Sequence, residues 1–218
     1  MTVSSTTRER RSCDVSRFVS SRVMTRMDPG DEPSLVMRLR AGDTGAFDRV
    51  YNAYRPRVFA FLLRMSRSRT VAEDLLDETW LRLVRHAASL RPDTRLGPWL
   101  FTVARNLYWS YRRASLLHEA SVPELIGLWP SPAAWPSPFD LAVAGELERR
   151  VEAALSTLPP QYREVLLLIA YEGLTPSDGA VVCGISPEAF RQRLSRARAA
   201  LAEMLDLTPT SAKRRFGT

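Results

Sequence analysis

The residues of this chain that are best suited to bind a nucleic acid lie near its C-terminal end. One face of a predicted helix there presents Arg191, Gln192, Ser195, Arg196 and Arg198. Arginine can bridge the two acceptors of guanine and glutamine can pair with adenine, so these residue types can read bases as well as hold phosphates. The alternative is an ordinary surface helix with solvated arginines. The pattern favours a helix that binds a DNA duplex.

The neighbouring residues predict how this helix is positioned. Its opposite face is apolar and consists of Phe190, Leu194, Ala197 and Leu201. Ser186 is expected to cap the helix, with Pro187 at its first position and Glu188 in its first turn. Gly184 suits a left-handed turn after a preceding helix. Together these features predict a helix-turn-helix, whose second helix fits a major groove.

A second candidate set lies on a predicted helix over residues 96–115. Its polar face presents Arg105, Asn106, Trp109, Arg112 and Arg113. Aromatic rings beside arginine and asparagine suit single-stranded nucleic acid, because bases stack on rings while guanidinium groups follow the phosphates. The alternative is that the aromatic residues fill the core of a small domain. That alternative stays open for Trp109 and is favoured for Tyr108 and Tyr111.

A third set is acidic, on a chain whose net charge is +7. It lies on a helix that we expect to begin with a capping box from Thr70 to Glu73. The exposed side of this helix presents Glu73, Asp74, Asp77 and Glu78. Its apolar side is predicted to contain Leu75, Leu76, Thr79, Trp80, Leu83 and Val84.

Composition narrows the class of function. The net charge of +7 and the pI near 10.1 favour an anionic partner, either nucleic acid or a membrane surface. No apolar run is long enough to span a bilayer, so we expect no membrane insertion. The sequence shows no Gly-rich phosphate loop and no His beside a nucleophile signature, so we expect no enzyme.

The cysteines and histidines are few and far apart. Cys13, Cys183, His86 and His118 form neither a zinc-binding spacing nor a disulfide framework. We therefore expect no metal and no cofactor, and a reducing, cytoplasmic location.

The segments predict an all-α protein, because no period-two strand pattern appears. Two small helical domains are expected, joined by a proline-rich linker, with the helix-turn-helix in the second domain. The expected parts are a disordered basic tail (1–30), a helical domain (31–117), the linker (118–144), a second helical domain (145–206) and a short tail (207–218). Four prolines between Pro130 and Pro138 prevent both helix and sheet from persisting in the linker.

The order of these segments resembles the extracytoplasmic-function (ECF) sigma factors of bacterial RNA polymerase, a group of the sigma-70 family. The resemblance covers Asp31 to Leu205, apart from the linker. It is based on AFDRVYNAYRPRVFAFLLRM, AEDLLDETWLRLVRH and PWLFTVARNLYWSYRR in the first domain, and on LPPQYREVLLLIAYEGLT and GISPEAFRQRLSRARAAL in the second. In that family these domains are called region 2 and region 4.

The resemblance implies a sigma factor that binds core RNA polymerase and directs promoter recognition and transcription initiation. Region 2 would bind the polymerase clamp helices of the β′ subunit through Glu73, Asp74, Asp77 and Glu78. It would hold the melted −10 strand through Arg105, Asn106, Trp109, Arg112 and Arg113, with the loop from Ser89 to Arg95. Region 4 would contact the double-stranded −35 element through Arg191, Gln192, Ser195 and Arg196. Location in the cytoplasm at the nucleoid and an anti-sigma factor as a further partner are family expectations.

The chain departs from the family pattern at three places. Asp77 stands where the family commonly has Gln, and Ser110 stands where an Asp is frequent before the pair Arg112 and Arg113. TPSDGAVV replaces the usual residues of the first motif helix, and Gly179 occupies a normally apolar position. Glycine there costs about 1 kcal/mol in helix propensity. A stand-alone helix-turn-helix regulator is the alternative function, but it leaves the acidic helix and the arginine-aromatic helix unexplained.

Overall fold

The computed structural model of the chain describes residues 32–121 and 145–205, and every regular element in these two ranges is a helix. The first range contains α2 (Glu32–Arg40), α3 (Thr44–Ser66), α4 (Arg69–His86), the 3₁₀ helix η1 (Ala87–Ser89) and α5 (Leu96–Ser121). The second contains α7 (Glu146–Thr157), α8 (Pro160–Leu166), the π-helical segment η2 (Leu167–Tyr171), α9 (Pro176–Cys183) and α10 (Pro187–Met204). The predicted all-α class is confirmed.

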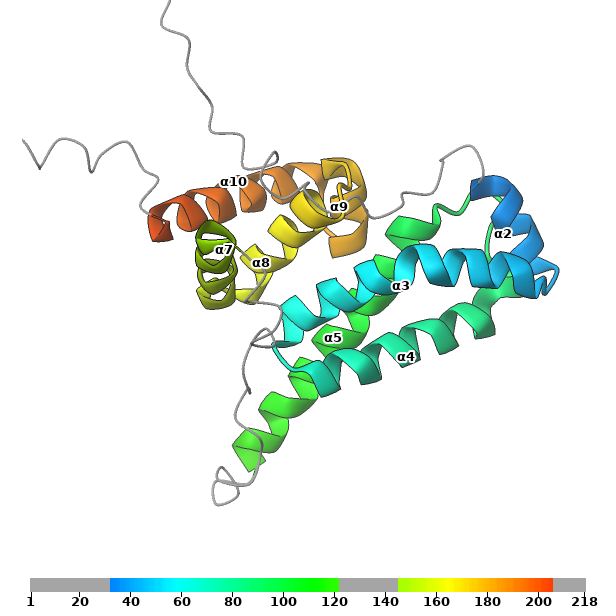
Figure 1. The fold of residues 1–218 in the computed structure, drawn as a ribbon, viewed down its shortest axis with the longest axis horizontal. Coiled ribbons are helices and arrows are strands. Elements are labelled where there is room, and N and C mark those ends of the chain that lie inside the picture. The colour runs from blue at the N-terminus through cyan, green and yellow to red at the C-terminus, as the bar shows by residue number, and fades with distance from the viewer. Residues whose placement is uncertain (1–31, 122–144, 206–218) are drawn as a thin grey trace, which may run out of the picture.

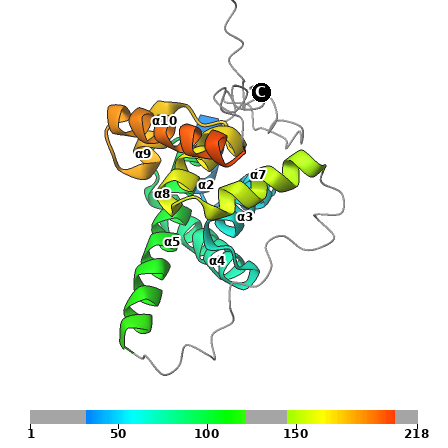
Figure 2. The ribbon, with the colours of Figure 1, turned by 90° about the vertical axis from the view of Figure 1, so that its left-hand side faces the viewer.

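The helices form two groups that lie against each other (Figure 1). Helices α2 to α5 form the first group and α7 to α10 the second, and the groups meet where α5 packs on α9 and α3 on α8. The C-terminal part of α5 extends away from both groups (Figure 2) and reaches Ser121, beyond the domain end at residue 117 that the sequence suggests. The predicted tails and the rest of the predicted linker lie outside the described residues.

The start of α4 differs from the sequence prediction. Arg67 adopts a left-handed conformation with φ of 59° and ends α3. Ser68 is then extended, and its side chain accepts a hydrogen bond from the backbone N–H of Val71 at 3.4 Å. The expected capping box from Thr70 to Glu73 is therefore wrong, because the left-handed turn places the cap two residues earlier.

The helix-turn-helix forms as predicted. Gly184 is left-handed with φ of 63°, and the Ser186 hydroxyl accepts a hydrogen bond from the N–H of Ala189 at 3.1 Å. Pro187 begins α10, whose apolar face is buried through Phe190, Leu194, Ala197 and Leu201. The turn and the cap together orient α10 across α8 and α9, on which it packs.

Gly179 lets α9 lie close against the ring of Phe190. A Cβ atom built at Gly179 would lie 2.4 Å from Cζ of Phe190 and 2.8 Å from its Cε2. Phe190 is fully buried, so its ring has no room to move aside. The departure from the family pattern therefore has a physical reason: the bulky Phe190 ring occupies the space that a side chain on α9 would need.

We expect Gly179→Ala to lower the free energy of unfolding by about 1–3 kcal/mol, because the added methyl group overpacks the contact with Phe190. Helix propensity alone predicts the opposite sign, a gain of about 1 kcal/mol. Urea titration of the full chain measures the difference. Ser177→Ala, at an exposed position of the same helix, serves as the control and should change stability little. Adding Phe190→Leu to Gly179→Ala should restore part of the loss, and a stabilised Gly179→Ala variant would contradict the steric explanation.

Candidate nucleic-acid interface

The four residues predicted to contact the −35 element lie on the outer face of α10. Arg191, Gln192, Ser195 and Arg196 lie away from the buried face of the helix, and all four are exposed to solvent. Arg191 forms an ion pair with Glu188 at 2.7 Å, and Gln192 donates a longer hydrogen bond of 3.4 Å to the same carboxylate. These hydrogen bonds hold the pKa of Glu188 below its usual value. The first turn of α10 thus presents a charged cluster to solvent.

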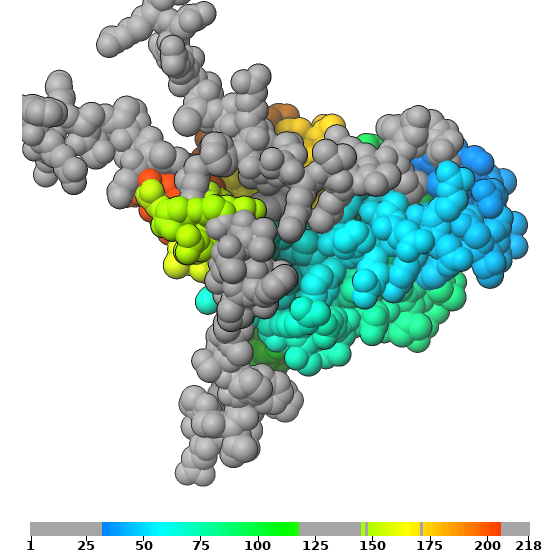
Figure 3. Space-filling view, viewed as in Figure 1, coloured from blue at the N-terminus to red at the C-terminus, as the bar shows by residue number. Residues whose placement is uncertain are grey.

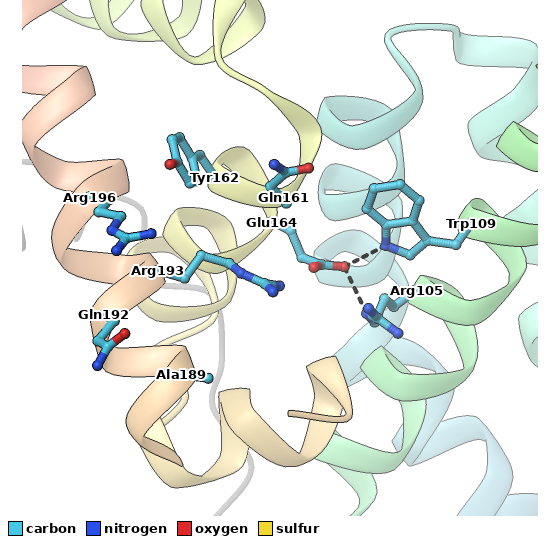
Figure 4. A pocket seen from close by; sticks show the side chains of 9 residues that line it. All are labelled: Arg105, Trp109, Gln161, Tyr162, Glu164, Ala189, Gln192, Arg193 and Arg196. Carbon is cyan, nitrogen blue, oxygen red and sulfur yellow. Dashed lines mark hydrogen bonds and ion pairs between the residues drawn. The ribbon is translucent and has the colours of Figure 1, made fainter. Parts of the chain in front are cut away.

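The residues predicted to hold the −10 strand are divided between solvent and the second helix group. Asn106 and Arg113 are exposed on α5 and Arg112 is partly buried. Arg105 and Trp109 instead point toward α8, where both donate to the same Glu164 oxygen, Oε1, at 2.8 Å each (Figure 4). Glu164 is completely buried. Trp109 is therefore neither a free stacking platform nor a simple core residue in this arrangement.

Two residues from each predicted DNA-binding set line one hollow between the helix groups. Its volume is about 570 Å³, and its walls come from α5, α8 and α10. Arg105 and Trp109 lie on one side, while Gln192, Arg193 and Arg196 lie on the other (Figure 4). Arg193 was not among the sequence candidates. Its position three residues after Phe190, at the edge of the apolar face, is the only sequence signal that it points inward.

Within residues 32–121 and 145–205, four ion pairs of the same polarity connect the two helix groups. The arginine belongs to the first group and the carboxylate to the second in Arg57–Glu172, Arg64–Glu152, Arg95–Asp178 and Arg105–Glu164. The distances are 2.9 Å for Arg57–Glu172, 2.7 Å for Arg64–Glu152 and 2.8 Å for Arg105–Glu164. Each of the four carboxylate side chains is at least nine-tenths buried. Sequence reasoning missed these pairs because their partners lie far apart in the chain.

Arg163 on α8 also connects the groups, but here the arginine belongs to the second group and donates to the first. Its guanidinium donates to the carbonyl oxygens of Arg64 and Met65, at the end of α3, at 3.2 Å each. It also donates to the carbonyls of Leu155, Ser156 and Leu158 in its own group. Burial lowers the pKa of Arg163, and the carbonyls at helix ends satisfy its donors. The Arg163 side chain thereby joins the C-terminal end of α3 to the C-terminal end of α7 through hydrogen bonds.

The predicted −10 loop is also connected to the second group. Arg91 pairs with Asp93 within the loop at 3.1 Å. Arg95, at the end of the loop, pairs with Asp178 in the first turn of α9. The loop and α5 therefore both contact carboxylates of the second helix group.

The acidic side of α4 is open to solvent, as predicted. Glu73, Asp74 and Asp77 are exposed and Glu78 is half-buried. Glu73 pairs with Arg69, and Glu78 pairs with Arg82. In the space-filling view α2, α3 and α4 form one continuous surface (Figure 3).

The apolar side of α4 differs from the prediction at one position. Val84 is 59% exposed, because it follows the buried Leu83 by about 100° around the helix and so lies outside the face that contacts α3 and α5. Leu81 is also exposed, at 49%. The exposed face of α4 therefore combines carboxylates with two apolar side chains.

Cys183 lies beside the buried carboxylate of Glu164. Its thiol donates to Glu164 Oε2 at 3.6 Å, and burial together with the nearby negative charge raises its pKa to about 12. A thiol with this pKa stays protonated at neutral pH and is a poor nucleophile.

No group of three His, Cys, Asp or Glu side chains that could hold a metal ion occurs in residues 32–121 or 145–205. Over the same ranges, no helix is long and apolar enough to cross a membrane.

Comparison with known proteins places both helix groups in one family. Residues 50–115 match sigma-70 region 2, and residues 148–201 match sigma-70 region 4. The RNA polymerase sigma factor CarQ of Myxococcus xanthus is 36% identical over 172 residues, which cover 77% of this chain and 94% of CarQ. The ECF RNA polymerase sigma factor SigM of Bacillus subtilis is 34% identical over 156 residues, 69% of this chain and 90% of SigM.

Solved structures agree with this assignment. The sigma factor RpoE of Bartonella quintana, in complex with the anti-sigma factor NepR, is 28% identical with a TM-score of 0.61, over 73% of this chain and 96% of that chain. CnrH, in complex with the cytosolic domain of CnrY, shares the fold at 23% identity and a TM-score of 0.59, over 81% of this chain and 97% of that chain. The chain therefore belongs to the ECF group of the sigma-70 family, non-enzymatic factors that direct promoter recognition and transcription initiation.

Proposed function

We propose that this sigma factor binds core RNA polymerase through the exposed face of α4 and holds promoter DNA through α5 and α10. The supporting observation is that α4 and α10 each present their candidate residues on the face opposite the core. A stand-alone DNA-binding regulator is not favoured, because it would not need region 2. The proposed boundaries are 31–117 for region 2 and 145–206 for region 4, with the end of α5 leading into the linker.

Run-off transcription with core polymerase on genomic fragments tests the proposed function directly and would identify the promoter. We also propose a cytoplasmic location at the nucleoid, where core polymerase and DNA are found. Because the relative RpoE was solved with an anti-sigma factor, an anti-sigma factor is a proposed further partner of this chain.

The face of α4 has the composition of a protein-binding surface. Exposed carboxylates provide charge complementarity to a basic partner, while Leu81 and Val84 provide apolar area that polymerase binding would remove from water. Asp74 and Asp77 are both exposed and form no ion pair among the described residues. Changing them therefore alters the surface without breaking a contact within the helix.

Asp74→Arg combined with Asp77→Arg should reduce affinity for core polymerase by about a hundredfold or more, because like charges placed against a basic surface cost several kcal/mol. A pull-down with core polymerase measures the loss, and circular dichroism should remain that of the wild type. The control is Asp48→Arg with Glu203→Arg, which changes the net charge equally at exposed positions on α3 and α10. Equal binding by both double variants would remove the assignment of α4 to the polymerase.

The exposed face of α10 is proposed to enter the major groove of the −35 element. Arg191 lies in the second turn of the helix and Arg196 lies one to two turns later, so both can reach the same groove. Because Arg191 pairs with Glu188 in the free protein, DNA binding exchanges that exposed ion pair for a contact with a base or phosphate.

Arg191→Ala and Arg196→Ala should each weaken −35-dependent transcription, and loss of a base contact should cost about 1–3 kcal/mol at one promoter position. A panel of promoters with single −35 substitutions distinguishes the two kinds of contact. If an arginine reads a base, its substitution by alanine should no longer weaken transcription from the promoter in which that base is changed. If the arginine holds phosphate, its substitution should weaken transcription from every promoter alike. Arg149→Ala, on α7, is the control and should leave all promoters unaffected. Unchanged activity of both α10 variants would contradict the role of this helix.

The indole of Trp109 is proposed to pack against the melted −10 strand once it leaves Glu164. Loss of one base–aromatic stack is worth roughly 1–3 kcal/mol. Trp109→Ala should therefore slow open-complex formation, measured by permanganate reactivity of melted thymines in the polymerase holoenzyme. Trp109→Phe retains a ring without the N–H donor and should open promoters nearly as fast as the wild type. Normal opening by Trp109→Ala, with only a lowered melting temperature, would assign Trp109 a purely structural role.

A further inference from the structure

The hollow between α5, α8 and α10 has the size of a small-molecule site. Its volume of about 570 Å³ lies within the range of about 300–1,000 Å³ that is usual for ligand pockets. Most of its lining side chains are charged, amide or aromatic. The composition of the walls therefore indicates a polar, charged ligand.

The lining side chains have a surplus of positive charge. The guanidinium groups of Arg105, Arg193 and Arg196 line the hollow, together with the carboxylate of Glu164. That carboxylate is already paired with Arg105 at 2.8 Å. Within the described ranges, Arg193 and Arg196 form neither an ion pair nor a hydrogen bond. Two guanidinium groups without a counter-charge fit the negative charges of phosphate groups, to which arginine can donate two parallel hydrogen bonds.

Arg193 is the arginine best placed to reach a ligand inside the hollow. It is partly buried, whereas Arg196 is exposed. Figure 4 shows the Arg193 side chain extending from α10 into the space beside Glu164. Partial burial of a cation without a counter-charge is unfavourable, and a bound phosphate would supply that charge. Glu188 on the same helix does not do so, because it pairs with Arg191 and does not line the hollow.

The same walls offer groups that suit a planar base. Tyr162 on α8 is partly buried and lines the hollow, so a base can stack on its ring. Gln161 and Gln192 also line it, and their amides can both donate and accept hydrogen bonds at the edge of a base. Phosphate-binding arginines beside an aromatic ring and two amides together match the two halves of a nucleotide.

We propose that this hollow binds a nucleotide, with its phosphate groups held by Arg193 and Arg196 and its base packed on Tyr162. Arg193 and Tyr162 belong to neither proposed DNA-binding set, so the site can be tested through them without DNA or polymerase. Gln192 and Arg196 do belong to the proposed −35 set. A bound nucleotide would therefore compete with promoter DNA for α10, and this consequence alone rests on the proposed function.

The experiment titrates the full chain with ADP, GDP, CDP and UDP by isothermal titration calorimetry. Pyrophosphate, which lacks the base, and adenosine, which lacks the phosphates, are the comparison ligands. We expect at least one diphosphate to bind at a single site per chain and more tightly than pyrophosphate, and adenosine not to bind. Absence of binding by all four nucleotides would overturn the inference. So would equal affinity for pyrophosphate and every nucleotide, because the base would then make no contact.

Arg193→Gln should weaken binding of the tightest nucleotide about tenfold or more, because charge-assisted hydrogen bonds to phosphate are lost. The matched control is Arg198→Gln, which removes the same charge from an exposed position of α10 that does not line the hollow. The control should keep the wild-type affinity. Equal affinities of the two variants would place the nucleotide elsewhere on this basic chain and overturn the inference.

A second pair of variants tests the contact with the base. Tyr162→Leu removes the ring but keeps an apolar side chain, and it should weaken nucleotide binding about fivefold or more. Tyr162→Phe keeps the ring and should bind nearly as tightly as the wild type. Pyrophosphate should bind both variants equally, which shows that the phosphate contacts are intact. Equal nucleotide affinities of Tyr162→Leu and Tyr162→Phe would contradict the proposed site.

Discussion

The hydrogen bonds that Arg105 and Trp109 donate to the buried carboxylate of Glu164 are the interaction on which the observed arrangement depends. A buried carboxylate is tolerated only when its oxygens are well partnered, and here a guanidinium, an indole N–H and a thiol surround it. Two of these partners come from the other domain. Separation of the domains would therefore expose the carboxylate to water. When the domains pack together the carboxylate loses water, so the Arg105 and Trp109 donors must be in place to replace it.

Polar contacts accompany apolar packing between the domains, whose buried apolar side chains belong to one cluster. Arg163 donates to backbone carbonyls on both sides, and the arginines of the four ion pairs come from α3, α5 and the loop before α5. Such contacts are geometrically specific, yet their net contribution is smaller than that of apolar burial, because each charge gives up water to form them. An interface with this many charged contacts resembles the more polar interfaces found between domains of one chain.

Within each domain, by contrast, apolar packing decides the structure. The ring of Phe190 lies so close to α9 that only glycine fits at position 179. The same ring anchors the buried face of α10 and so determines where its exposed face points. Gly179 lowers the helix propensity of α9. It also lets α10, which carries the proposed −35 contacts, pack closer to the core than a larger residue at position 179 would allow.

The sequence alone was sufficient for the all-α class, for the turn at Gly184, for the cap at Ser186 and for the exposed acidic and basic faces of α4 and α10. These features are local: each depends on helical periodicity or on the conformational preference of one residue. The tertiary structure alone determined the capping residue of α4, the exposure of Val84, the reason for Gly179 and the partners of Arg105 and Trp109. Those features depend on which segments meet in space. Glu164 lies 59 residues after Arg105, so no helical periodicity in the sequence indicates that they pair.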